Sequence, residues 1–170
     1  MSHLVRVVHF VEVLAVLGLT VALGGCIRHP ATPNLVGAMQ CACSFETFNE
    51  LVAVAGLSGT LEGPGPFTVL APTDAAFARL PAGRLEELLR PENRAQLRQV
   101  VLYHILGRKF SRAELQKQST LTTLSNEAIQ VTPVGQTVLL NDRVQVFTGD
   151  IAASNGVIHA LDGVLTPPAK

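Results

Sequence analysis

Residues 67–77, FTVLAPTDAAF, combine the signals of a strand and of a helix start within one short segment. Its first four residues are apolar or β-branched, which is typical of a short buried strand. Thr73 can cap a helix through its hydroxyl, and Asp74 is favourable beside the positive end of the helix dipole. Pro81 ends the apolar pattern that follows. The stretch therefore predicts a strand over residues 67–70 that leads into a short helix.

The residues on either side of this unit have the spacing of amphipathic helices. Ser44 stands in an N-cap position, apolar residues follow at spacings of three and four, and Gly56 supplies a C-terminal stop. A short helix is expected over residues 84–89, and Pro91 suits the first turn of a longer one. The apolar face of the longer helix consists of Leu97, Val100, Val101 and His104. The N-terminal half is therefore predicted to be mainly helical.

After Gly107 the pattern changes from helical spacing to alternating and β-branched segments. A helical turn at 111–115 precedes strands expected at 121–124, 128–132, 136–140, 143–151 and 157–165. Asn141-Asp142 suits a tight turn, and Asn155-Gly156 is a strong hairpin signal because both residues tolerate positive φ. Helices first and antiparallel strands after, within one unit, predict an α+β fold.

Length and charge limit the functions that this chain can have. Its 170 residues suffice for one domain and its hydrophobic core. Lys plus Arg and Asp plus Glu balance at 13 each, so the chain has no net charge with which to neutralise phosphates, and nucleic acid is not an expected partner. The sequence contains no Gly-x-Ser-x-Gly elbow, no His-Glu-x-x-His pair and no phosphate-binding glycine loop. We therefore expect no enzyme activity, no cofactor and no metal.

The first residues read as an export signal of the lipoprotein type, over residues 1–25. The apolar run from Val13 to Leu23 fits the hydrophobic region of a signal peptide and is too short for a membrane span, which needs about 20 residues. It ends in Leu23-Gly24-Gly25-Cys26, which resembles a bacterial lipobox. We expect lipid on Cys26 and a membrane-anchored protein in the periplasm, at the outer membrane or on the cell surface. An ordinary cleaved signal that leaves a free thiol, or a short uncleaved anchor, are the alternatives.

Residues 26–42 read as a tether between the anchor and the domain. The segment contains prolines, few charges and no helical or strand period. Near its end, Cys41 and Cys43 form a Cys-Ala-Cys pair in a chain with three cysteines. In an oxidising compartment these two cysteines can close a small disulfide, bridge to another molecule or bind a soft metal.

Three motifs, taken in order, resemble the fasciclin domain family. The first is Gly65 to Phe77 (GPFTVLAPTDAAF), the second is Val101 to Leu106 (VLYHIL), and the third is Asp150 to Leu165 (DIAASNGVIHALDGVL). Together with their spacing, they extend the resemblance over residues 43–168. The resemblance implies an extracellular or cell-surface module, an antiparallel β-sandwich or wedge with an N-terminal helical layer, and a role in adhesion.

The resemblance also implies candidate partner-binding residues. Animal members of the family are associated with integrin contact through an Asp-Ile pair and a Tyr-His element, which match Asp150, Ile151, Tyr103 and His104 here. The residue patterns favour a second interpretation of the histidines: His104 and His159 lie among aliphatic residues, where a hydrogen-bonded core imidazole is expected. Asp150 likewise suits the closing of a turn.

The sequence thus predicts a non-catalytic binding or adhesion module that recognises a protein or glycan at the cell envelope. A carrier of a small apolar ligand, such as a lipid or pigment, is the alternative hypothesis. A redox or metal role for Cys41 and Cys43 is the third.

Overall fold

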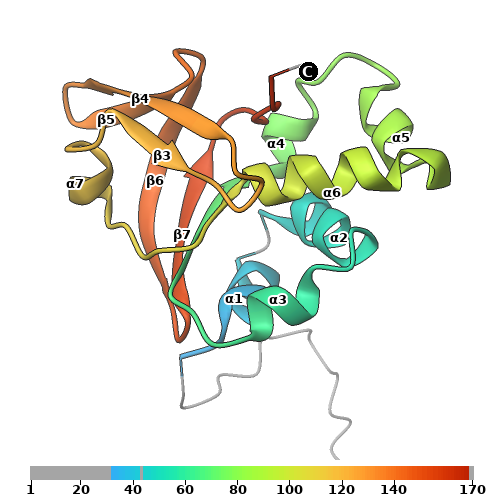
Figure 1. The fold of residues 1–170 in the computed structure, drawn as a ribbon, viewed down its shortest axis with the longest axis horizontal. Helices are drawn as coiled ribbons and strands as arrows, with labels where there is room; N and C mark the ends of the chain where they lie inside the picture. Colours follow the sequence, from blue (N-terminus) through green and yellow to red (C-terminus); the bar gives the residue numbers. More distant parts are fainter. Residues whose placement is uncertain (1–31, 43, 169–170) are drawn as a thin grey trace, which may run out of the picture.

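The computed structural model describes residues 32–42 and 44–168 as a curved sheet with all helices except α7 (Arg112–Leu115) on one side (Figure 1). The helices are α1 Leu35–Cys41, α2 Glu46–Val54, α3 Ser58–Glu62, α4 Asp74–Phe77, α5 Arg84–Leu89, the 3-10 turn η1 Pro91–Asn93, α6 Arg94–Tyr103 and α7 Arg112–Leu115. The strands are β1 Phe67–Pro72, β2 Ile105–Leu106, β3 Thr120–Thr122, β4 Ala128–Val134, β5 Thr137–Leu140, β6 Val144–Ala153 and β7 Gly156–Leu161. The expected α+β class is confirmed. Within the described ranges, no helix has the length and apolar character needed to cross a membrane.

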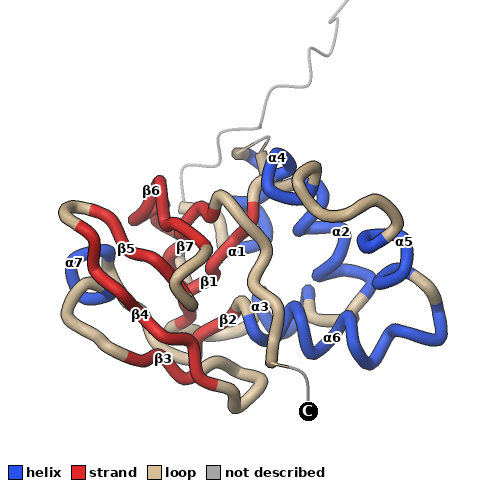
Figure 2. Tube along the Cα trace, turned by 90° about the horizontal axis from the view of Figure 1, so that it is seen from above, coloured by secondary structure: helices blue, strands red, loops and turns tan. Residues whose placement is uncertain are grey.

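The strands form a seven-stranded sheet in the order β2-β1-β7-β6-β5-β4-β3. Neighbouring strands are antiparallel except β1 and β7, which run parallel from Phe67 opposite Gly156 to Pro72 opposite Leu161. The sequence predicted only antiparallel strands, because short-range turn signals cannot show a pairing between segments so far apart in the chain. The sheet curls so that Leu124, just after β3, donates its N–H to the carbonyl of Ile105 in β2 at 2.8 Å. Figure 2 shows this curled sheet, with α7 on the side away from the other helices.

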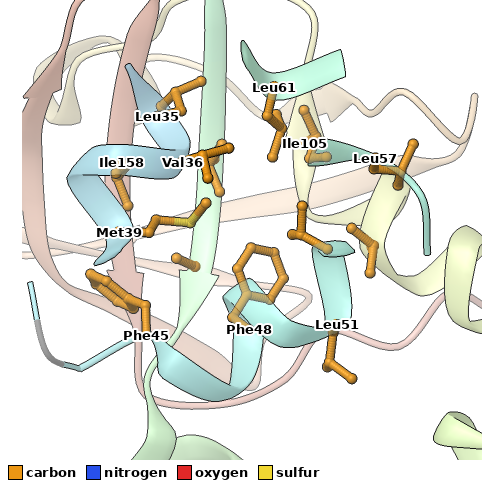
Figure 3. Close-up of a cluster of buried hydrophobic side chains, with 14 of the residues drawn as sticks. Leu35, Val36, Met39, Phe45, Phe48, Leu51, Leu57, Leu61, Ile105 and Ile158 are labelled. Atoms are coloured by element: carbon orange, nitrogen blue, oxygen red, sulfur yellow. The ribbon is translucent and has the colours of Figure 1, made fainter. Parts of the chain in front are cut away.

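Strands β1 and β7 bury both of their faces, and this creates two hydrophobic clusters. Val69 and Ala71 of β1 face a cluster shared with the helices, whereas Leu70 faces a cluster enclosed by the curled sheet. The helix-side cluster includes Leu35, Met39, Phe45, Phe48, Leu51, Leu57, Leu61, Ile105 and Ile158 (Figure 3). The sheet-side cluster includes Tyr103, Leu115, Leu121, Ile129, Val138, Leu140, Val146 and Leu161. Such burial on both faces marks β1 and β7 as the centre of the domain.

The tether is shorter than the sequence predicted. Residues 35–41 form helix α1, in which Leu35 and Met39 are at most 1% exposed. The side chain of Asn34 accepts a hydrogen bond from the N–H of Gly37 at 2.9 Å and so caps this helix. The prediction of a tether up to residue 42 is therefore wrong for this segment, because seven residues are too few to show a convincing helical period. The ordered unit includes residues before position 43.

The N-terminus of α2 is capped from a distance and not by Ser44. The carboxylate of Asp74 accepts hydrogen bonds from the N–H groups of Thr47 at 2.8 Å and Glu46 at 3.4 Å. Burial alone would raise the pKa of Asp74, but these donors outweigh it and hold the pKa below its usual value. Ser44 contributes its carbonyl, which accepts from the N–H of Asp74 at 3.0 Å. Thr73 caps α4 through its hydroxyl, as predicted.

The hairpin between β6 and β7 lies where the sequence predicted it, but Asn155 and Gly156 do not have the backbone conformation that was expected of them. Neither Asn155 nor Gly156 has a positive φ. The amide of Asn155 instead accepts from the N–H of Leu35 at 3.0 Å and donates to the carbonyls of Leu61 at 2.6 Å and Gly63 at 2.8 Å. Gly156 is needed because a Cβ at this position would collide with the carbonyl oxygen of Phe67. This turn therefore joins the sheet to α1 and to the end of α3.

Replacing Asn155 by Ala is expected to destabilise the domain. Three backbone groups would lose their partner, which costs about 1–3 kcal/mol for each buried group left unsatisfied. The midpoint of thermal unfolding should fall by several degrees, at roughly 2–4 °C per kcal/mol. Ser154→Ala is the matched control, because Ser154 is the exposed neighbour in the same turn. Equal melting midpoints for the two variants would contradict the bridging role of Asn155.

Candidate interaction surface on strand β6

Asp150 lies on an irregular part of β6, where the register with β7 shifts between Thr148 and Ile151. Its backbone has φ 60°, which is uncommon for a residue other than glycine. Its N–H donates to Nδ1 of His159 at 3.3 Å, and its carboxylate accepts from the N–H of Arg112 at 3.0 Å. The side chain is exposed, so a structurally fixed carboxylate faces solvent.

A chain of hydrogen bonds connects this corner to the centre of the sheet. Nδ1 of His159 accepts a hydrogen bond, so Nε2 carries the proton and donates to the carbonyl of Phe110 at 2.7 Å. The N–H of Phe110 in turn donates to the hydroxyl of Thr68 in β1 at 2.8 Å. Gly149 leaves room for the imidazole, because a Cβ there would lie 2.8 Å from Nδ1 of His159. Asp150 is thus held by β7, α7 and, through Phe110, by β1.

Both histidines, His104 and His159, are buried and hydrogen-bonded within the core, as the residue pattern predicted. Nδ1 of His104 contacts the carbonyl of Val100 at 2.7 Å, and Nε2 accepts from the N–H of Leu165 at 3.0 Å. Burial lowers the pKa of His104 to about 4, against the opposing effect of the hydrogen bond to Val100. Burial also lowers the pKa of His159, although Phe110 and Asp150 act in the other direction.

The structure does not bring the four resemblance-based residues into one exposed site. Tyr103 and His104 are each 1% exposed. The Tyr103 hydroxyl donates to the carbonyl of Ala128 at 3.1 Å and accepts from Asn141 at 3.0 Å, so it is engaged within the domain. Ile151 is half-buried against the helix-side cluster. Of the four, Asp150 presents the most open side chain to a partner.

Sequence reasoning missed Phe147, which has 48% of its surface exposed. Val144 and Val146 of the same strand point into the sheet-side cluster, whereas Phe147, at a register shift between Val146 and Thr148, is open to solvent. Val134, also 48% exposed, pairs with Thr137, whose hydroxyl donates to the carbonyl of Val146. The signal that could have found this surface is the apolar pair Val146-Phe147, which breaks the alternation expected of a strand with one wet face.

The cysteine predictions stay open. Cys41 is exposed at the end of α1, and Cys26 and Cys43 lie outside the described residues. The lipid anchor and the Cys41–Cys43 disulfide are therefore still predictions. Across residues 32–42 and 44–168, no group of three or more His, Cys, Asp or Glu side chains is arranged to hold a metal ion.

Comparisons with known proteins agree with the three sequence motifs. A family model described as the Fasciclin domain matches residues 43–167. Protein sll1483 of Synechocystis is 39% identical over 145 residues, covering 84% of this chain and 79% of that protein. Pig transforming growth factor-beta-induced protein ig-h3 is 34% identical over 137 residues, which cover 80% of this chain and 20% of that protein.

A solved structure has the same fold as this domain. The FAS1 domain pair from the insect cell adhesion molecule fasciclin I matches with a TM-score of 0.69 and 16% sequence identity. The match covers 82% of this chain and 52% of that chain. The predicted fasciclin-like fold is confirmed.

The lowered pKa of His104 predicts that mild acid destabilises the domain. The pKa of His104 is 6.5 in the unfolded chain and about 4 in the folded domain, so between these pH values the unfolded chain binds more protons than the folded domain does. The free energy of unfolding therefore has its full His104 contribution above pH 6.5 and decreases as the pH drops toward 4. Urea unfolding measured from about pH 7 to about pH 5, where most carboxylates stay ionised, should show a free energy of unfolding that decreases with decreasing pH. His104→Gln, which cannot titrate, should show a shallower slope. An unchanged slope in that variant would rule out His104 as a source of the pH dependence.

Proposed function

Because this chain belongs to the fasciclin domain family, we propose that it is an exported, non-catalytic adhesion module that binds a protein or glycan at the cell envelope. The family occurs in adhesion proteins, as the insect relative of known structure illustrates. The match to the family model covers nearly all of the described domain. Binding therefore accounts for this domain better than catalysis does.

The observation that carries the proposal is that β6 has two exposed residues three positions apart in the sequence, the aromatic ring of Phe147 and the fixed carboxylate of Asp150. Aromatic side chains are enriched at protein interfaces, because they offer a large contact area at a small entropic cost. Val134 extends the apolar area on the neighbouring part of the sheet. We define the partner surface by these three residues, Val134, Phe147 and Asp150.

The rigidity of the partner surface favours recognition of a partner without rearrangement. Asp150 is held by backbone and side-chain groups of two other elements, so little conformational entropy remains to be lost when a partner binds. The apolar part would supply affinity, and the carboxylate would select a partner that presents a hydrogen-bond donor or a positive charge. Tyr103 and His104 would not contact the partner in this proposal, but they stabilise the domain that carries the partner surface.

We further propose that a lipid on Cys26 holds the domain at a membrane. Helix α1 begins at Leu35, so only residues 27–34 separate the proposed anchor from the folded unit. This link spans at most roughly 25–30 Å when fully extended. Such a short link would keep the domain next to the membrane, where its partner surface would meet other envelope components.

Phe147→Ser is expected to abolish partner capture while the fold stays intact. The chain, immobilised and incubated with native envelope extract, should retain a defined set of proteins or glycans. Phe147→Ser and Asp150→Asn should lose that set. Val54→Ser is the matched control, because Val54 is an exposed apolar residue on helix α2, away from the sheet. Capture of the same set by Phe147→Ser, at an unchanged melting midpoint, would refute the partner surface.

Cys26→Ser is expected to release the protein from the membrane or to leave an unprocessed precursor. An acyl chain contributes about 0.8 kcal/mol for each buried methylene, and the balanced net charge of the chain gives no substitute for it. Fractionation and intact mass measurement of the wild type and the variant would show the loss of lipid mass. A variant that is found in the membrane fraction at the wild-type level, with normal processing, would disprove the anchor.

A further inference from the structure

A groove lies between α2, α5 and α6, on the helical side of the domain and away from the partner surface. Its volume is about 390 Å³, within the range of small-molecule sites. Val54, Leu89 and Leu97 give it an apolar lining. Arg90 and Arg94 also line it, and none of the lining residues is acidic. The groove therefore combines hydrocarbon surface with uncompensated positive charge.

Arg90 and Arg94 differ from the neighbouring arginines in their contacts within the fold. Arg84 pairs with Glu87 at 2.7 Å, and Arg98 donates to the carbonyl of Ala55 at the end of α2 at 3.2 Å. By contrast, the guanidinium groups of Arg90 and Arg94 have no hydrogen-bond or ion-pair partner within residues 32–42 and 44–168. Both residues are exposed. Two guanidinium groups beside an apolar groove match a carboxylate attached to a hydrocarbon chain.

The surroundings favour a small ligand over a protein partner at this place. A stable protein interface buries about 800 Å² on each side and usually has an apolar centre. Among the described residues, the large hydrophobic side chains that are exposed are Val54, Val134 and Phe147, and only Val54 lies at the groove. The apolar area here is therefore confined to the groove itself.

We propose that this groove binds a monocarboxylate with an aliphatic chain, such as a fatty acid, through Arg90 and Arg94. The hydrocarbon lies along Val54 and Leu89, which have exposed surface, and the carboxylate accepts hydrogen bonds from the two guanidinium groups. The site is separate from the partner surface and does not depend on it. Its occupation would give the module a second, small-molecule ligand.

Isothermal titration calorimetry of the unacylated chain that follows Cys26, residues 27–170, with monomeric octanoate in detergent-free buffer tests the proposal. Octanoate should bind saturably, whereas acetate, which lacks the chain, and octylammonium, which reverses the charge, should not. The double variant R90Q/R94Q should bind octanoate roughly tenfold more weakly or worse, because it loses both charge-assisted contacts. Arg143→Gln, at an exposed arginine in the β5–β6 turn, should bind like the wild type.

A second variant keeps the test decisive if R90Q/R94Q is unstable. Val54→Asp places a negative charge at an exposed edge of the groove and should also prevent octanoate binding, while circular dichroism shows an unchanged fold. Absence of saturable octanoate binding to the wild type, or equal affinity in a folded R90Q/R94Q, would overturn the proposal. Binding to phosphatidylglycerol vesicles without binding of free octanoate would overturn it too, because it would assign the arginines to an anionic membrane surface.

Discussion

The parallel pairing of β1 with β7 is the contact on which the rest of the domain depends. It joins Phe67 to Gly156 and continues to Leu161, so the first strand of the chain lies beside the last. The backbones approach closely at Gly156, where a side chain would collide with Phe67. Every residue of β7 is buried, because helices cover one face and the curled sheet covers the other. Both hydrophobic clusters therefore form only when these two strands meet.

The exposed surface is built on this buried centre. Thr68 of β1 binds Phe110, Phe110 binds His159 of β7, and His159 binds the backbone of Asp150. Each bond satisfies a polar group that would otherwise be buried without a partner, which costs more than the bond itself gains. The same groups that complete the core thus fix the position of the carboxylate that faces solvent. Through this coupling, a buried histidine would support the proposed partner surface without touching a partner.

The sequence predicted most of the elements and few of the connections between them. The helix at residues 84–89, the cap of Thr73 and the Asn141-Asp142 turn, with its positive φ values, depend on neighbouring residues and were predictable. The cap of α2 by Asp74, the packing of α1 into the core and the Thr68–Phe110–His159 chain connect residues far apart in the sequence. Spacing rules hold no information on such contacts. Of the candidate site, Asp150 was predicted through the family resemblance, whereas Phe147 and the arginine groove became visible only in three dimensions.

Because its N–H is bonded to His159 of β7, Asp150 is expected to belong to the most stable part of the domain, although its side chain is exposed. Native-state hydrogen exchange of the amides measures this directly, because amides of the stable centre exchange only on global unfolding and those of loops exchange by local opening. We expect the amide of Asp150, which donates to His159, to exchange as slowly as the amides of β7. Exchange of the Asp150 amide at the rate of an unprotected loop, while β7 stays protected, would contradict it.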